Sequence, residues 1–203
     1  MSSTTSVRGR GFTLIEVMIV IAIVSVLAAL AIVGVRSYLA TAKTAEAKQI
    51  VGAITRTAIA QYERERDVSQ ILAATGVVSA NTHLLCTSAT PVPLTFTAVE
   101  GTKYQPSNAP GVDFNSGSTL EGWQCLGFSI SQPIYFQYSY QVGGSYVSQG
   151  LPGAPLPTGD GFEVGAVGDL KADGQRCTIT RIGEVRDGEI ATSTTIYTNI
   201  DSD

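Results

Sequence analysis

The sequence has little of what enzymes use for catalysis. Its 203 residues include one histidine, one tryptophan and three cysteines. No phosphate-binding glycine loop, nucleophile elbow or catalytic pair of carboxylates is recognisable. These absences give no support to an enzyme, and no cofactor is expected. The single histidine, His83, is predicted to be a surface residue in a loop rather than half of a metal site with Cys86.

Proline and charge are both missing from long stretches near the N-terminus. Proline is absent from Phe12 to Arg66, and charge is absent from the 19 residues Val17–Val35, where Ser25 is the single strongly polar side chain. At ~1.5 Å per residue this uncharged run spans about 28 Å of helix, close to the ~30 Å core of a bilayer. We therefore expect Val17–Val35 to cross a membrane.

The charge balance excludes a polyanion as the main partner. The formal net charge is −4, so the chain is not expected to bind nucleic acid or anionic lipid through its overall field. Arg8 and Arg10 precede the apolar run, and the positive-inside rule places them in the cytoplasm. The C-terminal part is then expected on the other side of the membrane, where disulfides can form.

A carboxylate stands at the start of the apolar run. A charge at the centre of a bilayer costs roughly 2.5 kcal/mol or more. A carboxylate at the membrane end of such a helix, as Glu16 is, is therefore expected to have a specific role. The block Gly11-Phe12-Thr13-Leu14-Ile15-Glu16 and the run that follows resemble the N-terminal signature of type IV prepilins and pseudopilins, as far as about Ala47. The resemblance implies cleavage between Gly11 and Phe12 by a prepilin peptidase and N-methylation of Phe12. It also implies that Phe12 and Glu16 act in assembly, as a paired amine and carboxylate.

Two other interpretations of the N-terminus compete with this one. A secretory signal peptide could be cut near Leu27–Ala31, but Glu16 interrupts its apolar region and the helical pattern continues past Ala31. A plain membrane anchor leaves Gly11 and Glu16 unexplained.

Many pilins have a proline within the apolar run, and this chain departs from them in having none.

The helix is expected to continue beyond the membrane. Residues 36–66 are rich in good helix formers, so one helix is predicted from Phe12 to about Arg66. Its outer half has an apolar stripe at spacings of three to five: Leu39, Ala42, Ala45, Ile50, Ile54, Ala58 and Tyr62. A short second helix is predicted at Ser69–Val78.

The remaining sequence predicts short strands. Alternation is strongest at Ile134–Val142, and further strands are expected near Leu94–Val99, at Phe162–Leu170, at Cys177–Val185 and at Ile190–Ile200. Asp173-Gly174 and Asp187-Gly188 are turn signals, and the glycine-rich segment Gly143–Gly161 is predicted to be an exposed loop. The expected fold is α+β, a long N-terminal helix packed against an antiparallel meander, which is the pilin fold.

The pairing of the three cysteines stays open at this point. Cys86–Cys125 is favoured because it would tie the region after the helix to the first strong strand. Cys125–Cys177 competes, because the resemblance to pilins implies a bridge that fixes the C-terminal region. Three free thiols are the third alternative. Asp169–Gly174 faintly suggests the calcium loop found near the C-terminus of pseudopilins, but Lys171 occupies a ligand position and favours a simple turn.

The predicted organisation is a leader at residues 1–11, a membrane and assembly helix at 12–35, and a globular head at 36–203. By resemblance, the function is that of a structural subunit that polymerises into a type IV pilus for twitching motility and adhesion. A pseudopilin of type II secretion or a minor pilin is the alternative. The implied partners are further copies of the chain, the prepilin peptidase, the inner-membrane assembly platform and the membrane itself. The implied locations are the inner membrane before assembly and the extracellular fibre after it.

Overall fold

The computed structural model describes residues 11–64 and 83–200. The chain divides into two compact units, Met1–Ala42 and Lys43–Asp203, and α1 (Leu14–Tyr62) contributes to both. The second unit then contains the following elements: β1 (Ala89–Val92), the short 3₁₀ helices η1 (Phe96–Val99) and η2 (Asp113–Asn115), α3 (Gly122–Leu126), β2 (Gln137–Val142), β3 (Gly161–Gly168), β4 (Cys177–Arg186), β5 (Glu189–Thr192) and β6 (Tyr197–Ile200). A long helix followed by an antiparallel sheet confirms the predicted α+β fold.

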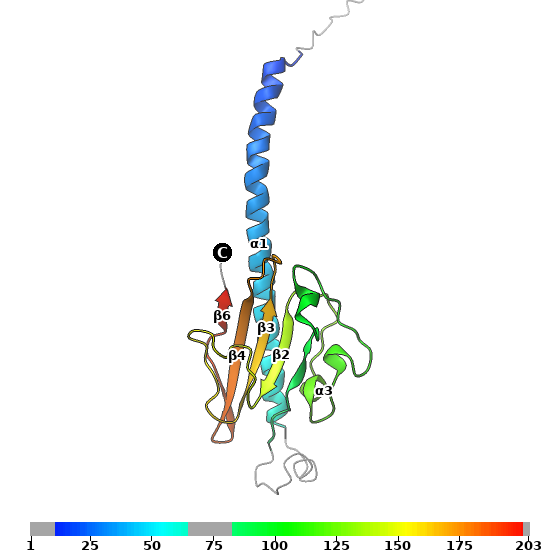
Figure 1. Ribbon diagram of the computed structural model, residues 1–203, viewed down its shortest axis with the longest axis vertical. Helices are drawn as coiled ribbons and strands as arrows, with labels where there is room; N and C mark the ends of the chain where they lie inside the picture. Colours follow the sequence, from blue (N-terminus) through cyan, green and yellow to red (C-terminus); the bar gives the residue numbers. More distant parts are fainter. Residues whose placement is uncertain (1–10, 65–82, 201–203) are drawn as a thin grey trace, which may run out of the picture. The chain divides into compact units, whose positions relative to one another are not determined.

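The sheet is an antiparallel meander. Its strands lie in the order β1-β2-β3-β4-β5, and β6 also pairs with β4 (Figure 1). The tight turn between β4 and β5 falls on Asp187-Gly188, as predicted, and both residues have positive φ, at 53° and 84°. Two consecutive positive φ angles are typical of the hairpin turns whose twist matches that of the flanking strands.

The core of the second unit lies between the sheet and the outer part of α1. Alternate residues of the central strands face the helix and are buried: Phe136, Tyr138, Tyr140, Phe162, Val164, Ala166 and Ile179. They form one cluster with Ala47, Val51, Ile54 and Ala58 of α1. The period-two pattern that predicted β2 and β3 therefore reflects one face packed on a helix.

The buried stripe of α1 differs from the predicted one. Ile54, Ala58 and Tyr62 are buried as expected, but Ala45 is exposed while Ala47 is fully buried. Thr55 is also buried, which its polarity did not suggest, because its hydroxyl donates to Val51 O at 2.8 Å. A hydroxyl satisfied within its own helix can be buried at little cost.

Two predicted strands have different bounds in the structure. The strand expected at Leu94–Val99 is wrong: β1 precedes it, and residues 96–99 form η1. Pro91 and Pro93 have no backbone N–H, so a regular ladder cannot continue through this segment. The strand expected from Ile134 begins at Gln137, because Ile134 pairs instead with Tyr104 in an isolated bridge.

The last predicted strand, Ile190–Ile200, is split into β5 and β6. Thr192 of β5 pairs with Gly183, and Tyr197 of β6 pairs with Thr180. The chain therefore advances five residues from β5 to β6 while the paired positions on β4 advance three. The two extra residues form a bulge-like interruption, a feature that alternation alone does not reveal. The long helix ends at Tyr62, before the predicted end near Arg66, and Glu63 and Arg64 form a bend. The predicted helix at Ser69–Val78 lies outside the described residues.

A disulfide joins Cys86 to Cys125, the pairing that the sequence favoured, and Cys177 is a free thiol. Cys125 lies in α3, which packs against β1, and both bonded cysteines are buried. The bridge therefore ties the segment that leads into β1 to the short helix α3, next to the fully buried Trp123.

Removal of this bridge is expected to destabilise the second unit strongly. The bonded residues are 39 positions apart, and the loop-entropy relation gives about 4 kcal/mol for a closed loop of about that length. We expect the double variant Cys86→Ala/Cys125→Ala to lose about that much unfolding free energy in guanidinium titrations of the detergent-solubilised chain. Cys177→Ala is the matched control and should change little. An unchanged midpoint in the wild type after verified reduction would contradict this expectation.

Candidate functional site

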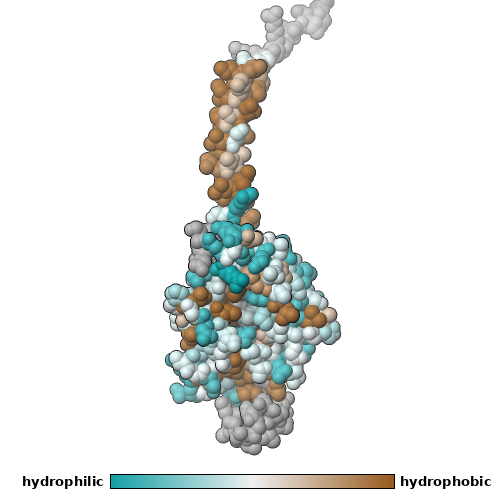
Figure 2. Space-filling model, viewed as in Figure 1, coloured by the Kyte–Doolittle hydropathy of each residue, from teal (hydrophilic) through white to brown (hydrophobic). Residues whose placement is uncertain are grey.

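The N-terminal unit is an apolar helix with no protein around it. Every residue from Leu14 to Val35 is exposed in the structure, and Figure 2 shows apolar surface along this part of α1. Among the described residues, α1 is the one helix long and apolar enough to cross a membrane. Ser25 does not disturb this surface, because its hydroxyl donates to Ile21 O at 2.6 Å within the helix.

The helix begins with a capping box. Thr13 Oγ1 accepts the backbone N–H of Glu16 at 3.3 Å, and the Glu16 carboxylate accepts the backbone N–H of Thr13 through a longer contact of 3.5 Å. This reciprocal pair satisfies two of the donors that a helix N-terminus leaves open. The Thr-x-x-Glu spacing is visible in the sequence, so this role of Thr13 could have been predicted there.

The capping box leaves part of the Glu16 carboxylate available. Within the described residues, the contact to Thr13 uses Oε2, and Oε1 accepts no hydrogen bond. Phe12 directly precedes the capping box, one helical turn before Glu16 in sequence. One oxygen of Glu16 is therefore available to a further donor while the cap stays formed.

Gly11 and Phe12 precede the first turn of α1. Both are exposed and outside regular secondary structure, and a Cβ added at Gly11 would meet no atom within 4 Å. Among the described residues, none places a steric demand on glycine at this position. Residues 1–10, which hold the rest of the predicted leader, lie outside the described residues.

The loop Asp169–Gly174 is a turn organised by one carboxylate. Asp169 is buried, and its oxygens accept the backbone N–H groups of Lys171, Asp173 and Gly174 at 2.8–3.4 Å. Burial opposes ionisation of Asp169, but the backbone donors outweigh it and lower its pKa. Because the carboxylate already serves these amides, the structure favours the turn over a calcium loop.

His83 and the tyrosines contribute to packing. His83 Nδ1 lies 2.9 Å from Tyr62 O, and its ring lies against the Tyr62 ring with a centroid distance of 5.6 Å. Tyr138 and Tyr140 are buried, and Lys43 Nζ lies 3.9 Å from the centroid of the Tyr135 ring. In the part of the chain that is described, no three His, Cys, Asp or Glu residues are grouped so that they could hold a metal ion.

The comparison with protein families finds one match. Residues 8–32 match the prokaryotic N-terminal methylation motif. No curated protein and no solved structure matches the chain. The chain therefore carries a type IV prepilin-like methylation motif on a long apolar helix, and its α+β architecture is pilin-like. The motif implies processing by a prepilin peptidase, and it suggests a structural subunit rather than an enzyme.

Proposed function

We propose that this chain is a structural subunit of a type IV pilus, cut between Gly11 and Phe12, methylated at Phe12 and polymerised through α1. The single observation that supports this most is the exposed apolar helix α1, which begins at Leu14 and carries Glu16 in its first turn, within residues 8–32 that match the methylation motif. Before assembly its apolar surface would lie in the inner membrane. In the fibre the same surface would lie against α1 of other copies, so it would meet water in neither state.

Pairing between Glu16 and the new amine would direct assembly. An ionised carboxylate in an apolar bundle is costly alone, and an ammonium partner offsets that cost for both groups. The inner-membrane assembly platform and its cytoplasmic ATPases would supply the work of extension and retraction. The second unit would form the outer shell of the fibre, where it mediates surface motility and adhesion.

Deletion of the gene, followed by complementation, tests this function. The deletion strain is expected to lose surface fibres in electron micrographs and to lose twitching zones on agar, and the wild-type gene should restore both. Fibres that persist and contain the protein only in trace amounts would instead identify a minor pilin. Intact fibres together with a defect in protein export would identify a pseudopilin of type II secretion.

A further inference from the structure

The segment between β2 and β3, residues 143–160, lies across the sheet face opposite α1. We call it the strap. A Cβ added at Gly165 would lie 2.4 Å from Val147 Cγ2, so the strap rests directly on the backbone of β3. Tyr197 Oη of β6 donates to Pro152 O at 2.9 Å, which shows how far the strap extends across the sheet (Figure 1). The segment has no helix or strand and most of its residues are exposed or half-buried, as the predicted exposed loop requires, but Ser148 is buried against the sheet.

The first half of the strap is attached through a buried carboxylate. Glu163 is fully buried near the start of β3, on the face that the strap covers. Its oxygens accept the backbone N–H of Val147 at 2.7 Å and that of Ser148 at 3.3 Å, and it also bonds the Ser148 hydroxyl. Ser148 is itself fully buried. One side chain therefore holds two consecutive amides and a hydroxyl of the strap.

Within the described residues, no cation forms an ion pair with Glu163. Gln141 of β2 and Ile182 of β4 are paired with Glu163 and share its face, and neither is charged. In the part of the chain that the structure describes, the ionisable side chains on this side of the sheet are Tyr146 and Asp160 of the strap, Glu184 and Arg186 of β4, Glu189 of β5 and Tyr197 of β6, and Arg186 is paired with Glu184 rather than with Glu163. Burial raises the pKa of Glu163, and the donors from Ser148 and Val147 lower it without cancelling that effect.

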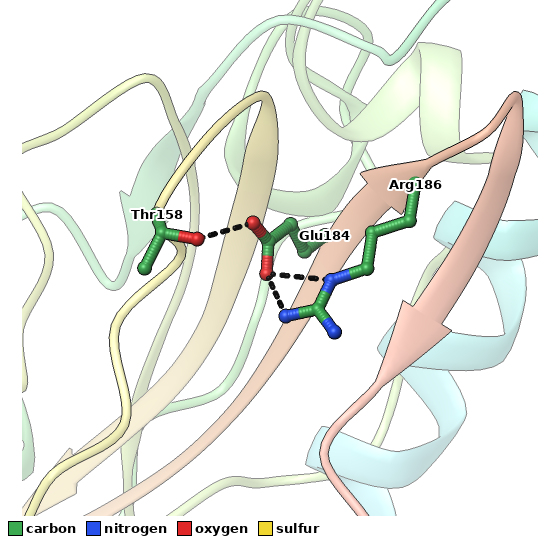
Figure 3. A network of polar contacts seen from close by, with 3 residues as sticks. All are labelled: Thr158, Glu184 and Arg186. Atoms are coloured by element: carbon green, nitrogen blue, oxygen red, sulfur yellow. Dashed lines mark hydrogen bonds and ion pairs between the residues drawn. The ribbon is translucent and has the colours of Figure 1, made fainter.

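The second half of the strap has a different attachment. Thr158 Oγ1 donates to Glu184 Oε1 at 2.6 Å, and Arg186 forms an ion pair of 2.8 Å with Glu184 Oε2 (Figure 3). The hydrogen bond from Thr158, and next those from Arg186, lower the pKa of Glu184. The pKa of one anchoring carboxylate, Glu163, is therefore raised, and the pKa of the other, Glu184, is lowered.

We propose that the strap is a pH-sensitive cover whose first half, around Val147 and Ser148, is released from the sheet when Glu163 ionises. In the closed state a neutral Glu163 can still accept the Val147 amide and the Ser148 hydroxyl through its carboxyl oxygens. In the open state the carboxyl group meets water, and its pKa returns towards the ordinary 4.5. A pKa that is higher when closed means that closure is favoured below 4.5 and is lost as the pH rises through the closed-state pKa.

The consequence is a head surface that changes with pH. As the pH rises, the glycine-centred strip of β2 and β3 beneath Val147, which includes Ser139 and Gly165, becomes accessible. The Thr158–Glu184 attachment is not lost with rising pH, because its hydrogen bonds lower the pKa of Glu184 and favour the ionised carboxylate. The strap therefore opens from one end and remains tethered at the other.

Hydrogen exchange of the full chain in detergent micelles tests this proposal. Protection factors of the Val147 and Ser148 amides, corrected for intrinsic rates, are compared from about pH 4 to about pH 8 in the wild type and in Glu163→Gln. In the wild type the protection should fall with rising pH, by about tenfold for each unit of pKa difference between the closed and open states. In Glu163→Gln, which cannot ionise, the pH dependence should disappear.

Two further variants keep the test decisive if Glu163→Gln folds poorly. Ser148→Ala removes a donor that lowers the pKa of Glu163, so the loss of protection should move to higher pH. Glu189 is an exposed carboxylate on β5, and Glu189→Gln is the matched control. In this variant the protection of the Val147 and Ser148 amides should depend on pH as in the wild type. Wild-type protection that does not change with pH would overturn the proposal. The same pH dependence in Glu163→Gln as in the wild type would also overturn it.

Discussion

Glu16→Ala is expected to abolish fibres while leaving leader cleavage intact. The substituted helix would still enter the membrane, because it becomes more apolar. Without the carboxylate, the amine at Phe12 would remain unpaired among apolar helices in the fibre. Removing one partner of a buried ion pair costs about 3–5 kcal/mol, which lowers the association constant of each subunit by roughly two to four orders of magnitude.

The structure supplies a control that separates this charge from the helix cap. Glu16→Gln retains a side-chain oxygen that can accept the Thr13 N–H, so the capping box persists while the charge is lost. Thr13→Ala has the opposite effect and should cost about 1 kcal/mol of helix stability. If the charge directs assembly, Glu16→Gln fails as Glu16→Ala does. Fibres formed normally by Glu16→Gln would restrict Glu16 to capping.

The second large effect is expected at Gly11. We predict that Gly11→Val leaves the chain uncut, because a branched side chain beside the scissile bond obstructs access of the peptidase to the backbone. The chain itself tolerates the change, since a Cβ at Gly11 meets no atom within 4 Å. A processing defect would therefore report on the peptidase and not on misfolding. Intact mass of the membrane fraction distinguishes the precursor from the mature chain.

Gly9→Val is the matched control for this prediction. Gly9 lies two residues before Gly11 in the predicted leader. We expect the Gly9→Val variant to be cut between Gly11 and Phe12 as in the wild type. Normal processing of Gly11→Val would contradict the predicted site. Loss of processing in both variants would mean that leader conformation as a whole, rather than the residue before the cut, controls the peptidase.

The features that could be predicted from the sequence depend on simple periodic or compositional signals. The uncharged run predicted the exposed helix of the N-terminal unit, and alternation predicted the inward face of Phe136, Tyr138 and Tyr140. Asp187-Gly188 predicted its turn because few residues adopt positive φ readily. In each case neighbouring residues determine the outcome, so local sequence is sufficient.

The features that could not be predicted depend on contacts between distant residues. Alternation places Glu163 on the solvent side of β3, and nothing local indicates that Val147 and Ser148 return to cover it. The buried position of Thr55 and the division of the last strand into β5 and β6 likewise follow from tertiary packing and register. Sequence patterns give the two faces of a strand, but not what covers the second face.

The most direct test of the pilus-subunit function is the N-terminal sequence and intact mass of the protein sheared from cell surfaces. A chain in the fibre fraction that starts at Phe12 and is heavier by one methyl group is the predicted result. A chain that starts at Met1 and stays in the membrane would contradict it and would indicate an anchored domain. A start near Ile32 would also contradict it, because the apolar run would then be a signal peptide.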